Sequence, residues 1–154
     1  MSMHTPVLDP VVTAPYGFRS DSGQKTFHNG INFISRSGDT RVFSIARGRV
    51  IQDIDQCTPV MSHVQRSPWS GNVVAIEHEI DERRYYALYI HLLSTDIPDN
   101  LTVQPGFELG RYAEQSAGMV GPHLHLTILN EQGDVIDPTP LLVKSGIPAH
   151  PAVA

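Results

Sequence analysis

The sequence predicts an all-β fold, and two observations lead to that prediction. Twelve glycines and twelve prolines interrupt the 154 residues, so that only short segments remain between turns. Those segments are rich in alternating or β-branched residues, and none keeps an apolar period of 3.6 over ten residues or more. Short, closely spaced strands of this kind are typical of all-β sandwiches and barrels.

Six segments are the expected strands, and one is an expected helix. In chain order the strands are 42–46, 48–54, 72–78, 83–91, 103–109 and 123–129. The short helix is expected over 139–144, after Asp137-Pro138. Neither a repeat nor a change of composition divides the chain. We therefore expect one domain over residues 1–154, with its core at about 12–140 and short tails at both ends.

Composition and charge exclude several classes of protein. Apolar residues make up 40% of the chain, which is too many for a disordered protein. The formal net charge of −5 gives no basic footprint for nucleic acid or an anionic membrane. No apolar run approaches the roughly 20 residues of a membrane-spanning helix. Cys57 is the only cysteine, so an intrachain disulfide is excluded.

Two histidines one residue apart are the strongest functional signal. They lie in Gly121-Pro122-His123-Leu124-His125-Leu126. In a strand, His123 and His125 share one face, while Leu124 and Leu126 point into a core on the other. Two imidazoles on one rigid surface are suited to metal binding or to acid–base chemistry.

Two further histidines extend this candidate site. In the strand 83–91, alternation places Tyr85, Ala87, Tyr89 and His91 on one face, which makes Tyr89 a candidate for substrate contact. His28 precedes a short apolar segment. A catalytic zinc takes three protein ligands and leaves one position open, so a fourth histidine can act as a base. Each histidine alone is more ordinarily a hydrogen-bonded structural residue.

Four ordered motifs resemble one known family. They are Pro15-Tyr16-Gly17-Phe18-Arg19, His28-Asn29-Gly30-Ile31-Asn32-Phe33, Tyr89-Ile90-His91-Leu92 and the histidine motif at 121–126. Together they resemble the lysostaphin-like, or LytM-type, zinc endopeptidases that cut peptidoglycan stem peptides or cross-bridges. The resemblance covers about residues 12–140 and implies a mostly antiparallel β-structure with a substrate groove and long loops.

The resemblance also implies a role for each site residue. His28, Asn32 and His125 occupy the positions of the zinc ligands, and His91 and His123 occupy those of the catalytic pair. The family has an aspartate where this chain has Asn32. An amide retains an oxygen lone pair but brings no charge, so we expect a zinc-competent but weakened site.

A long polar segment, 53–70, separates two of the expected strands. Such a loop is uncommon inside a compact domain and is often functional. Trp69 near its end is either a substrate contact on the wall of the groove or a residue that packs back on the core. Both alternatives stay open from sequence alone.

The expected function is zinc-dependent hydrolysis of peptide bonds in peptidoglycan. The alternative is a weak or inactive LytM-like module that binds peptidoglycan or a partner, as an amidase regulator or as part of a phage or secretion assembly. Residues 1–10 lack the features of a secretory signal. Because the substrate lies in the periplasm or cell wall, we expect a phage-encoded protein, an injected effector or a chain trimmed of its signal.

Overall fold

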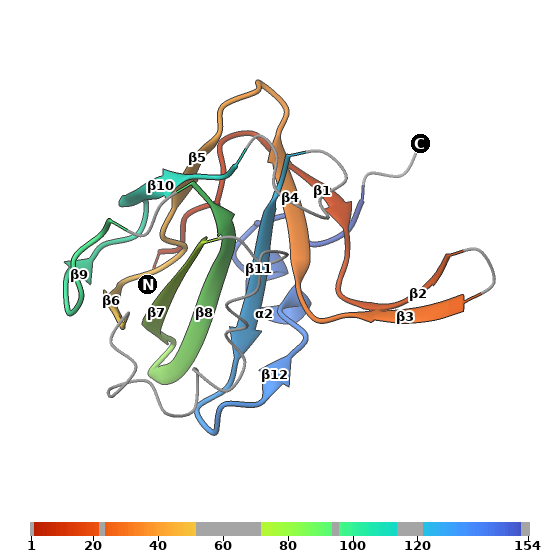
Figure 1. The fold of residues 1–154 in the computed structure, drawn as a ribbon. Coiled ribbons are helices and arrows are strands. Elements are labelled where there is room, and N and C mark those ends of the chain that lie inside the picture. Colours follow the sequence, from red (N-terminus) through yellow and green to blue (C-terminus); the bar gives the residue numbers. More distant parts are fainter. Residues whose placement is uncertain (1, 22–23, 52–71, 94–95, 114–121, 152–154) are drawn as a thin grey trace.

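The computed structural model describes residues 2–21, 24–51, 72–93, 96–113 and 122–151. Within these ranges the chain forms short antiparallel strands and one short helix (Figure 1). The elements are β1 (Pro10–Ala14), β2 (Gly17–Asp21), β3 (Gln24–His28), β4 (Ile31–Ser35), β5 (Arg41–Phe43), β6 (Gly48–Val50), β7 (Asn72–Ile80), β8 (Arg83–Leu92), β9 (Thr102–Val103), β10 (Glu108–Arg111), β11 (Leu124–Leu129), β12 (Val135–Ile136) and α2 (Thr139–Val143). The predicted all-β fold class is confirmed.

One large sheet organises the described part of the chain. Its strands are ordered β1-β4-β11-β8-β7-β6-β9, and β12 pairs with β11. Neighbouring strands in it run antiparallel. Two smaller sheets consist of β10 with β5 and of β2 with β3. β11 comes late in the chain yet lies between β4 and β8, near the centre of the large sheet.

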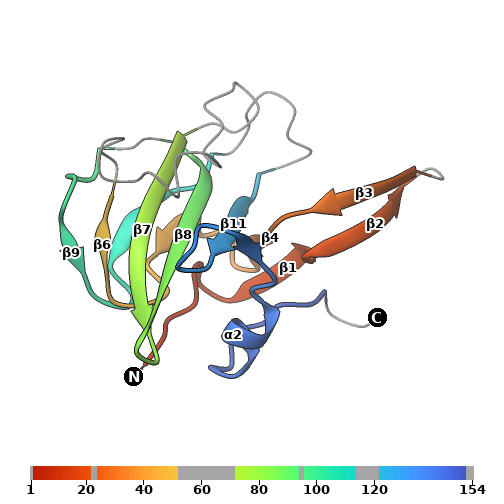
Figure 2. The same ribbon diagram turned by 90° about the horizontal axis from the view of Figure 1, so that it is seen from below.

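The main core lies on one face of the large sheet. Leu124, Leu126 and Ile128 of β11 are fully buried there, as alternation predicts. The same core cluster contains side chains from β5, β10 and α2, namely Val42, Leu109, Leu141 and Leu142. These elements therefore cover this face of the sheet, and α2 lies beneath it in Figure 2.

A second, smaller apolar cluster lies on the opposite face. It contains Ile51, Ala75, Tyr86, Leu88 and Leu129. The alternate residues of β8 divide between the two clusters, because Ala87 and Tyr89 belong to the main core. The face that carries the smaller cluster also carries His125, since His125 alternates with Leu124 and Leu126 on β11.

The expected elements agree with the observed ones in most places. The segments 72–78, 83–91 and 123–129 coincide closely with β7, β8 and β11, and the expected helix coincides with α2. The strands expected over 42–46 and 48–54 begin as β5 and β6 but end at Phe43 and Val50, and residues 52–54 lie outside the described ranges. The single strand expected over 103–109 is wrong. It is two strands, β9 and β10, because Gly106 adopts a φ of +84° in the turn between them.

The hairpin of β2 and β3 projects from the body of the protein (Figures 1 and 2). At its base the ring of Phe27 packs edge-on against Tyr16, with centroids 5.2 Å apart. Phe18 pairs with Phe27 across the hairpin, and their centroids lie 5.0 Å apart. The hairpin ends at His28, so this aromatic packing orients the strand that presents that histidine.

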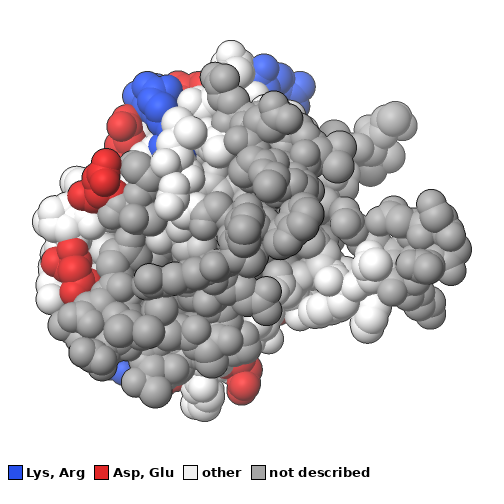
Figure 3. All heavy atoms as spheres, in the orientation of Figure 1, with Lys and Arg blue, Asp and Glu red and all other residues white. Residues whose placement is uncertain are grey.

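Charged side chains of both signs occur on the face seen in Figure 3. Described acidic and basic groups lie along its margin. Arg41 pairs with Asp39 at 2.7 Å. Among the described residues, no helix is long and apolar enough to span a bilayer.

Candidate functional site

The site is built around His125, on the central strand of the large sheet. His125 lies opposite Asn32 of β4 on one side and Ile90 of β8 on the other. Its neighbours Leu124 and Leu126 are fully buried in the main core, so its ring projects from the other face. Strand pairing thus brings His125 beside Asn32, which lies 93 residues earlier in the sequence.

His28 reaches the same place from the end of β3. Its Nδ1 donates a hydrogen bond to the carbonyl oxygen of Pro15 at 2.8 Å, which leaves the lone pair on Nε2. The rings of His28 and His125 meet edge-on, with centroids 4.9 Å apart.

Gly30, in the turn after His28, permits this approach. A Cβ atom on Gly30 would lie 2.3 Å from the carbonyl oxygen of Leu126 and 2.7 Å from Nε2 of His125. Neither distance is possible for real atoms, so a glycine is needed for the turn to pack against β11.

Asn32 meets His125 through its side chain. Oδ1 of Asn32 lies 3.0 Å from Nδ1 of His125. Asn32 is half-buried, whereas its neighbours Ile31 and Phe33 are fully buried in the main core. The structure therefore brings together all three residues that were expected to hold a metal.

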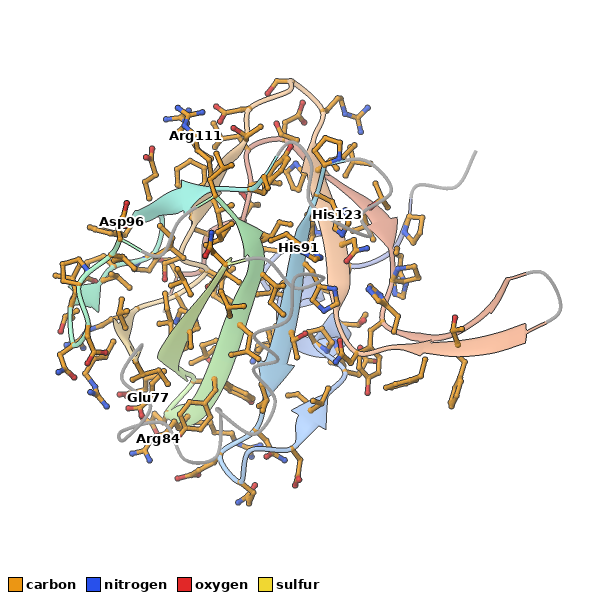
Figure 4. The ribbon with its side chains drawn as sticks, viewed as in Figure 1. Glu77, Arg84, His91, Asp96, Arg111 and His123 are labelled. Atoms are coloured by element: carbon orange, nitrogen blue, oxygen red, sulfur yellow. The ribbon has the colours of Figure 1, made fainter. Side chains whose placement is uncertain are left out.

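His91 and His123 form the other half of the site. Their ring centroids lie 4.8 Å apart, and His91 lies 6.2 Å from His125. Figure 4 shows their side chains next to each other, from the end of β8 and from the residue before β11. Both residues expected to act as the catalytic pair thus lie beside the expected ligands.

A β-bulge places His91 at the site. Asn72 pairs with Leu92 and Val73 pairs with Ile90, so His91 is an extra residue in β8. Its φ of +73° lies in the left-handed region, which few residues other than glycine adopt. Ile90 belongs to the smaller cluster and Leu92 to the main core, so the alternation of β8 shifts by one residue at His91. The bulge turns His91 toward His123 and His125.

Two expectations about Tyr89 are corrected by this bulge. Regular alternation placed Tyr89 and His91 on one face and made Tyr89 a candidate for substrate contact. Tyr89 is instead fully buried in the main core, where its hydroxyl bonds to His78 at 2.8 Å. Tyr89 therefore does not face a substrate. Trp69 and the segment 53–70 lie outside the described residues.

Asn29 and Thr127 also contact His125, and sequence reasoning missed both. Nε2 of His125 lies 3.0 Å from Oδ1 of Asn29 and 2.8 Å from Oγ1 of Thr127. The signal for Thr127 was present in the sequence, because residues two apart in a strand share a face. Asn29 carried no such signal, since it lies in the turn between β3 and β4.

Electrostatics keep His125 neutral. Burial lowers the pKa of its imidazole to about 3, and the neighbouring rings of His28, His91 and His123 lower it further in the same direction. At neutral pH the ring therefore has one nitrogen with a lone pair, as a metal ligand requires.

The geometry fits a tetrahedral metal. Two ligand atoms at zinc bond lengths lie about 3.3 Å apart on such a site, and two histidine rings lie about 5 Å apart between centroids. The observed 3.0 Å between His125 Nδ1 and Asn32 Oδ1 and 4.9 Å between the rings of His28 and His125 are close to these values. Across the described ranges, no three His, Cys, Asp or Glu side chains form a metal cluster by themselves. A metal held by His28 and His125 would therefore take its third protein donor from the Asn32 amide.

The residues of this site lie in a region that matches a known protein family. The model of peptidase family M23 matches residues 26–138. No curated protein is significantly similar to the chain in sequence.

Several solved structures share its fold. Lysostaphin from Staphylococcus simulans is 19% identical, with a TM-score of 0.70, over 100% of this chain and 59% of its own. LytU is 18% identical, with a TM-score of 0.65, over 86% of this chain and 84% of its own. A zinc-containing peptidase from Vibrio cholerae is 24% identical, with a TM-score of 0.62, over 89% of this chain. The chain spans only 39% of that Vibrio cholerae protein.

The likeness to these structures establishes the fold, and the family match covers most of the sequence. That match includes all five residues expected at the site. The chain belongs to peptidase family M23.

Proposed function

We propose that this protein is a zinc-dependent endopeptidase that hydrolyses peptide bonds in peptidoglycan stem peptides or cross-bridges. The observation that carries the proposal is the convergence of five side chains on one face of the sheet. His28, Asn32 and His125 provide three ligand atoms, and His91 and His123 lie beside them as a pair of rings 4.8 Å apart. The proposed substrate class follows from the family match and from the resemblance to endopeptidases that cut peptidoglycan.

Each of the three ligand residues would hold the metal through one side-chain atom. His28 uses Nε2, since its Nδ1 is bonded to Pro15. His125 uses Nδ1, and Asn32 uses Oδ1. Zinc, when bound, supplies a Lewis acid that polarises a peptide carbonyl and acidifies water.

The histidine pair moves the protons of the reaction. One ring accepts a proton from the attacking water, and the other donates a hydrogen bond to the carbonyl oxygen as negative charge develops there. The protonated ring then gives its proton to the leaving amine. Because the bulge fixes His91 beside His123, both rings can act on the same peptide bond of the substrate without a further rearrangement.

A second function is favoured by Asn32. A neutral amide in place of a carboxylate weakens metal binding, which is the change expected in a module that binds without cutting. The fold is also similar to that of SpoIIQ in the SpoIIQ–SpoIIIAH pore-forming complex, at 18% identity and a TM-score of 0.61. In this alternative the same face binds peptidoglycan or a partner protein.

Release of muropeptides from purified sacculi separates the two functions. The wild-type protein is incubated with added zinc, with a chelator, and with neither, beside the variant His123→Ala. Peptides released only with zinc and only by the wild type support the peptidase. Co-sedimentation with sacculi without release at any zinc concentration supports the binding module.

A further inference from the structure

The nitrogen of His125 that points away from the expected metal is held by two side chains. Nε2 lies 3.0 Å from Oδ1 of Asn29 and 2.8 Å from Oγ1 of Thr127. The Thr127 hydroxyl lies 3.4 Å from the same Asn29 oxygen. Thr127 is only 1% exposed, so its hydroxyl finds partners inside the protein. These three groups form a small closed network behind the ring.

The chemistry of the network determines where the proton of His125 resides. The carbonyl oxygen of Asn29 can only accept hydrogen bonds. With the proton on Nε2, the ring donates to both neighbours, and the Thr127 hydroxyl donates to Asn29; every group then has a partner. With the proton on Nδ1, the lone pair of Nε2 would face the Asn29 oxygen at 3.0 Å. That arrangement is repulsive.

On the side of the ring that faces the expected metal, Asn32 offers a competing partner for the proton. Nδ1 lies 3.0 Å from Oδ1 of Asn32, so a proton on Nδ1 could be donated there. Such a proton would occupy the atom that must bind the metal. Asn32 can satisfy either tautomer, because its amide oxygen accepts from a protonated Nδ1 and its amide nitrogen, once the side chain turns over, donates to an unprotonated one. Asn29 cannot turn over in the same way, because its oxygen accepts the hydrogen bond from Thr127. The outcome depends on the residues behind the ring.

We propose that Asn29 and Thr127 are positioning residues, which hold the proton of His125 on Nε2 so that Nδ1 presents its lone pair to the metal beside Asn32. This inference rests on the metal site of the proposed function but not on hydrolysis. Hydrogen bonds from a histidine ligand to such partners orient the ring and strengthen it as a ligand. The effect matters more here because Asn32 brings no negative charge of its own.

Two measurements on the purified chain test the inference. The first is the tautomer of His125 in the metal-free protein at pH 7, read from the ¹⁵N shifts of histidine-labelled samples. The second is the zinc dissociation constant, measured in competition with a chromophoric chelator. We expect the proton on Nε2 in the wild type. In Asn29→Ala and Thr127→Val we expect a shift toward the Nδ1 tautomer and roughly tenfold weaker zinc binding.

The variants are chosen so that a folding defect cannot imitate this result. Asn29 is exposed, so its truncation leaves the core intact. Thr127→Ser keeps the hydroxyl and should restore both the tautomer and the affinity. Thr102→Val changes an exposed threonine on β9 and should alter neither.

The possible outcomes are distinct. A wild-type His125 protonated on Nδ1 would overturn the inference, and so would unchanged tautomer and affinity in both variants. A wild-type protein that binds zinc with the proton on Nε2 but releases no peptide from sacculi would contradict the proposed peptidase and support this inference.

Discussion

Tyr89 and His91 are separated by one residue of β8, yet they lie on opposite faces of the sheet. Tyr89 is fully buried in the main core, whereas His91 meets the rings of His123 and His125. The extra residue in β8, with its φ of +73° at His91, reverses the alternation between them. The site therefore depends on a local departure from regular strand geometry.

Asn72 holds the strand end that carries this bulge. Its side-chain nitrogen donates to the carbonyl oxygens of Leu92 and Leu93, at 3.1 and 2.8 Å. We expect Asn72→Asp to lower kcat/KM by roughly tenfold to a hundredfold, because a carboxylate repels both carbonyls and displaces His91. Asn72→Ala should lower it less. Zinc affinity should stay within twofold in both, and full activity in Asn72→Asp would contradict this account.

Mutations in the two halves of the site should have different effects, one on kcat and the other on zinc affinity. His91→Ala and His123→Ala remove proton transfer, so we expect kcat to fall by about 10²- to 10⁴-fold while the zinc dissociation constant changes little. His28→Ala removes a ligand and should weaken zinc binding itself. Paired kinetic and chelator-competition measurements check this division. Equal losses of zinc affinity in all three variants would show that the assignment of roles is wrong.

Asn32→Asp should tighten zinc binding. The variant keeps the oxygen that lies near His125 but adds a negative charge, which stabilises a divalent cation. We expect about a tenfold lower dissociation constant, which corresponds to about 1.4 kcal/mol of added attraction. Asn32→Ala, which removes the oxygen, serves as the opposite control. An unchanged affinity in Asn32→Asp would mean that residue 32 does not bind the metal.

His78 should make the fold sensitive to acid. It is fully buried, and burial lowers its pKa to about 4 from the ordinary 6.5. Because His78 is harder to protonate in the folded protein than in the unfolded chain, the contribution of its neutral ring to stability is complete above pH 6.5. That contribution is lost as the pH falls toward 4. The loss amounts to about 3 kcal/mol over that window.

Urea unfolding at several pH values measures this contribution. Other groups also titrate in acid, so the quantity to compare is the difference in free energy of unfolding between the wild type and His78→Gln. That difference should narrow from pH 7 to pH 4, because glutamine does not titrate. A difference that stays constant over this range would exclude His78 as the source.

The sequence predicted the strands whose side chains alternate clearly, and it missed features that depend on backbone geometry. The alternation around His123 and His125 correctly placed Leu124, Leu126 and Ile128 in the core. Nothing in the pattern of β8 indicated a bulge, because the left-handed backbone conformation of His91 does not alter the order of apolar and polar residues in the sequence. The assignment of Tyr89 to the substrate face failed for that reason. Five strands of at most five residues, β1 to β4 and β12, were not among the expected ones, because so short a segment carries little periodic signal.

The central position of β11 also bears on synthesis of the chain. A ribosome produces His28, Asn32 and His91 before it reaches residue 124, but β4 and β8 have no common neighbour until β11 pairs with both. Since chains emerge N-terminus first, the incomplete chain holds histidines of the proposed site that no strand has yet joined. A premature stop before β11 would therefore leave the proposed metal site unassembled, however much of the earlier sheet had formed.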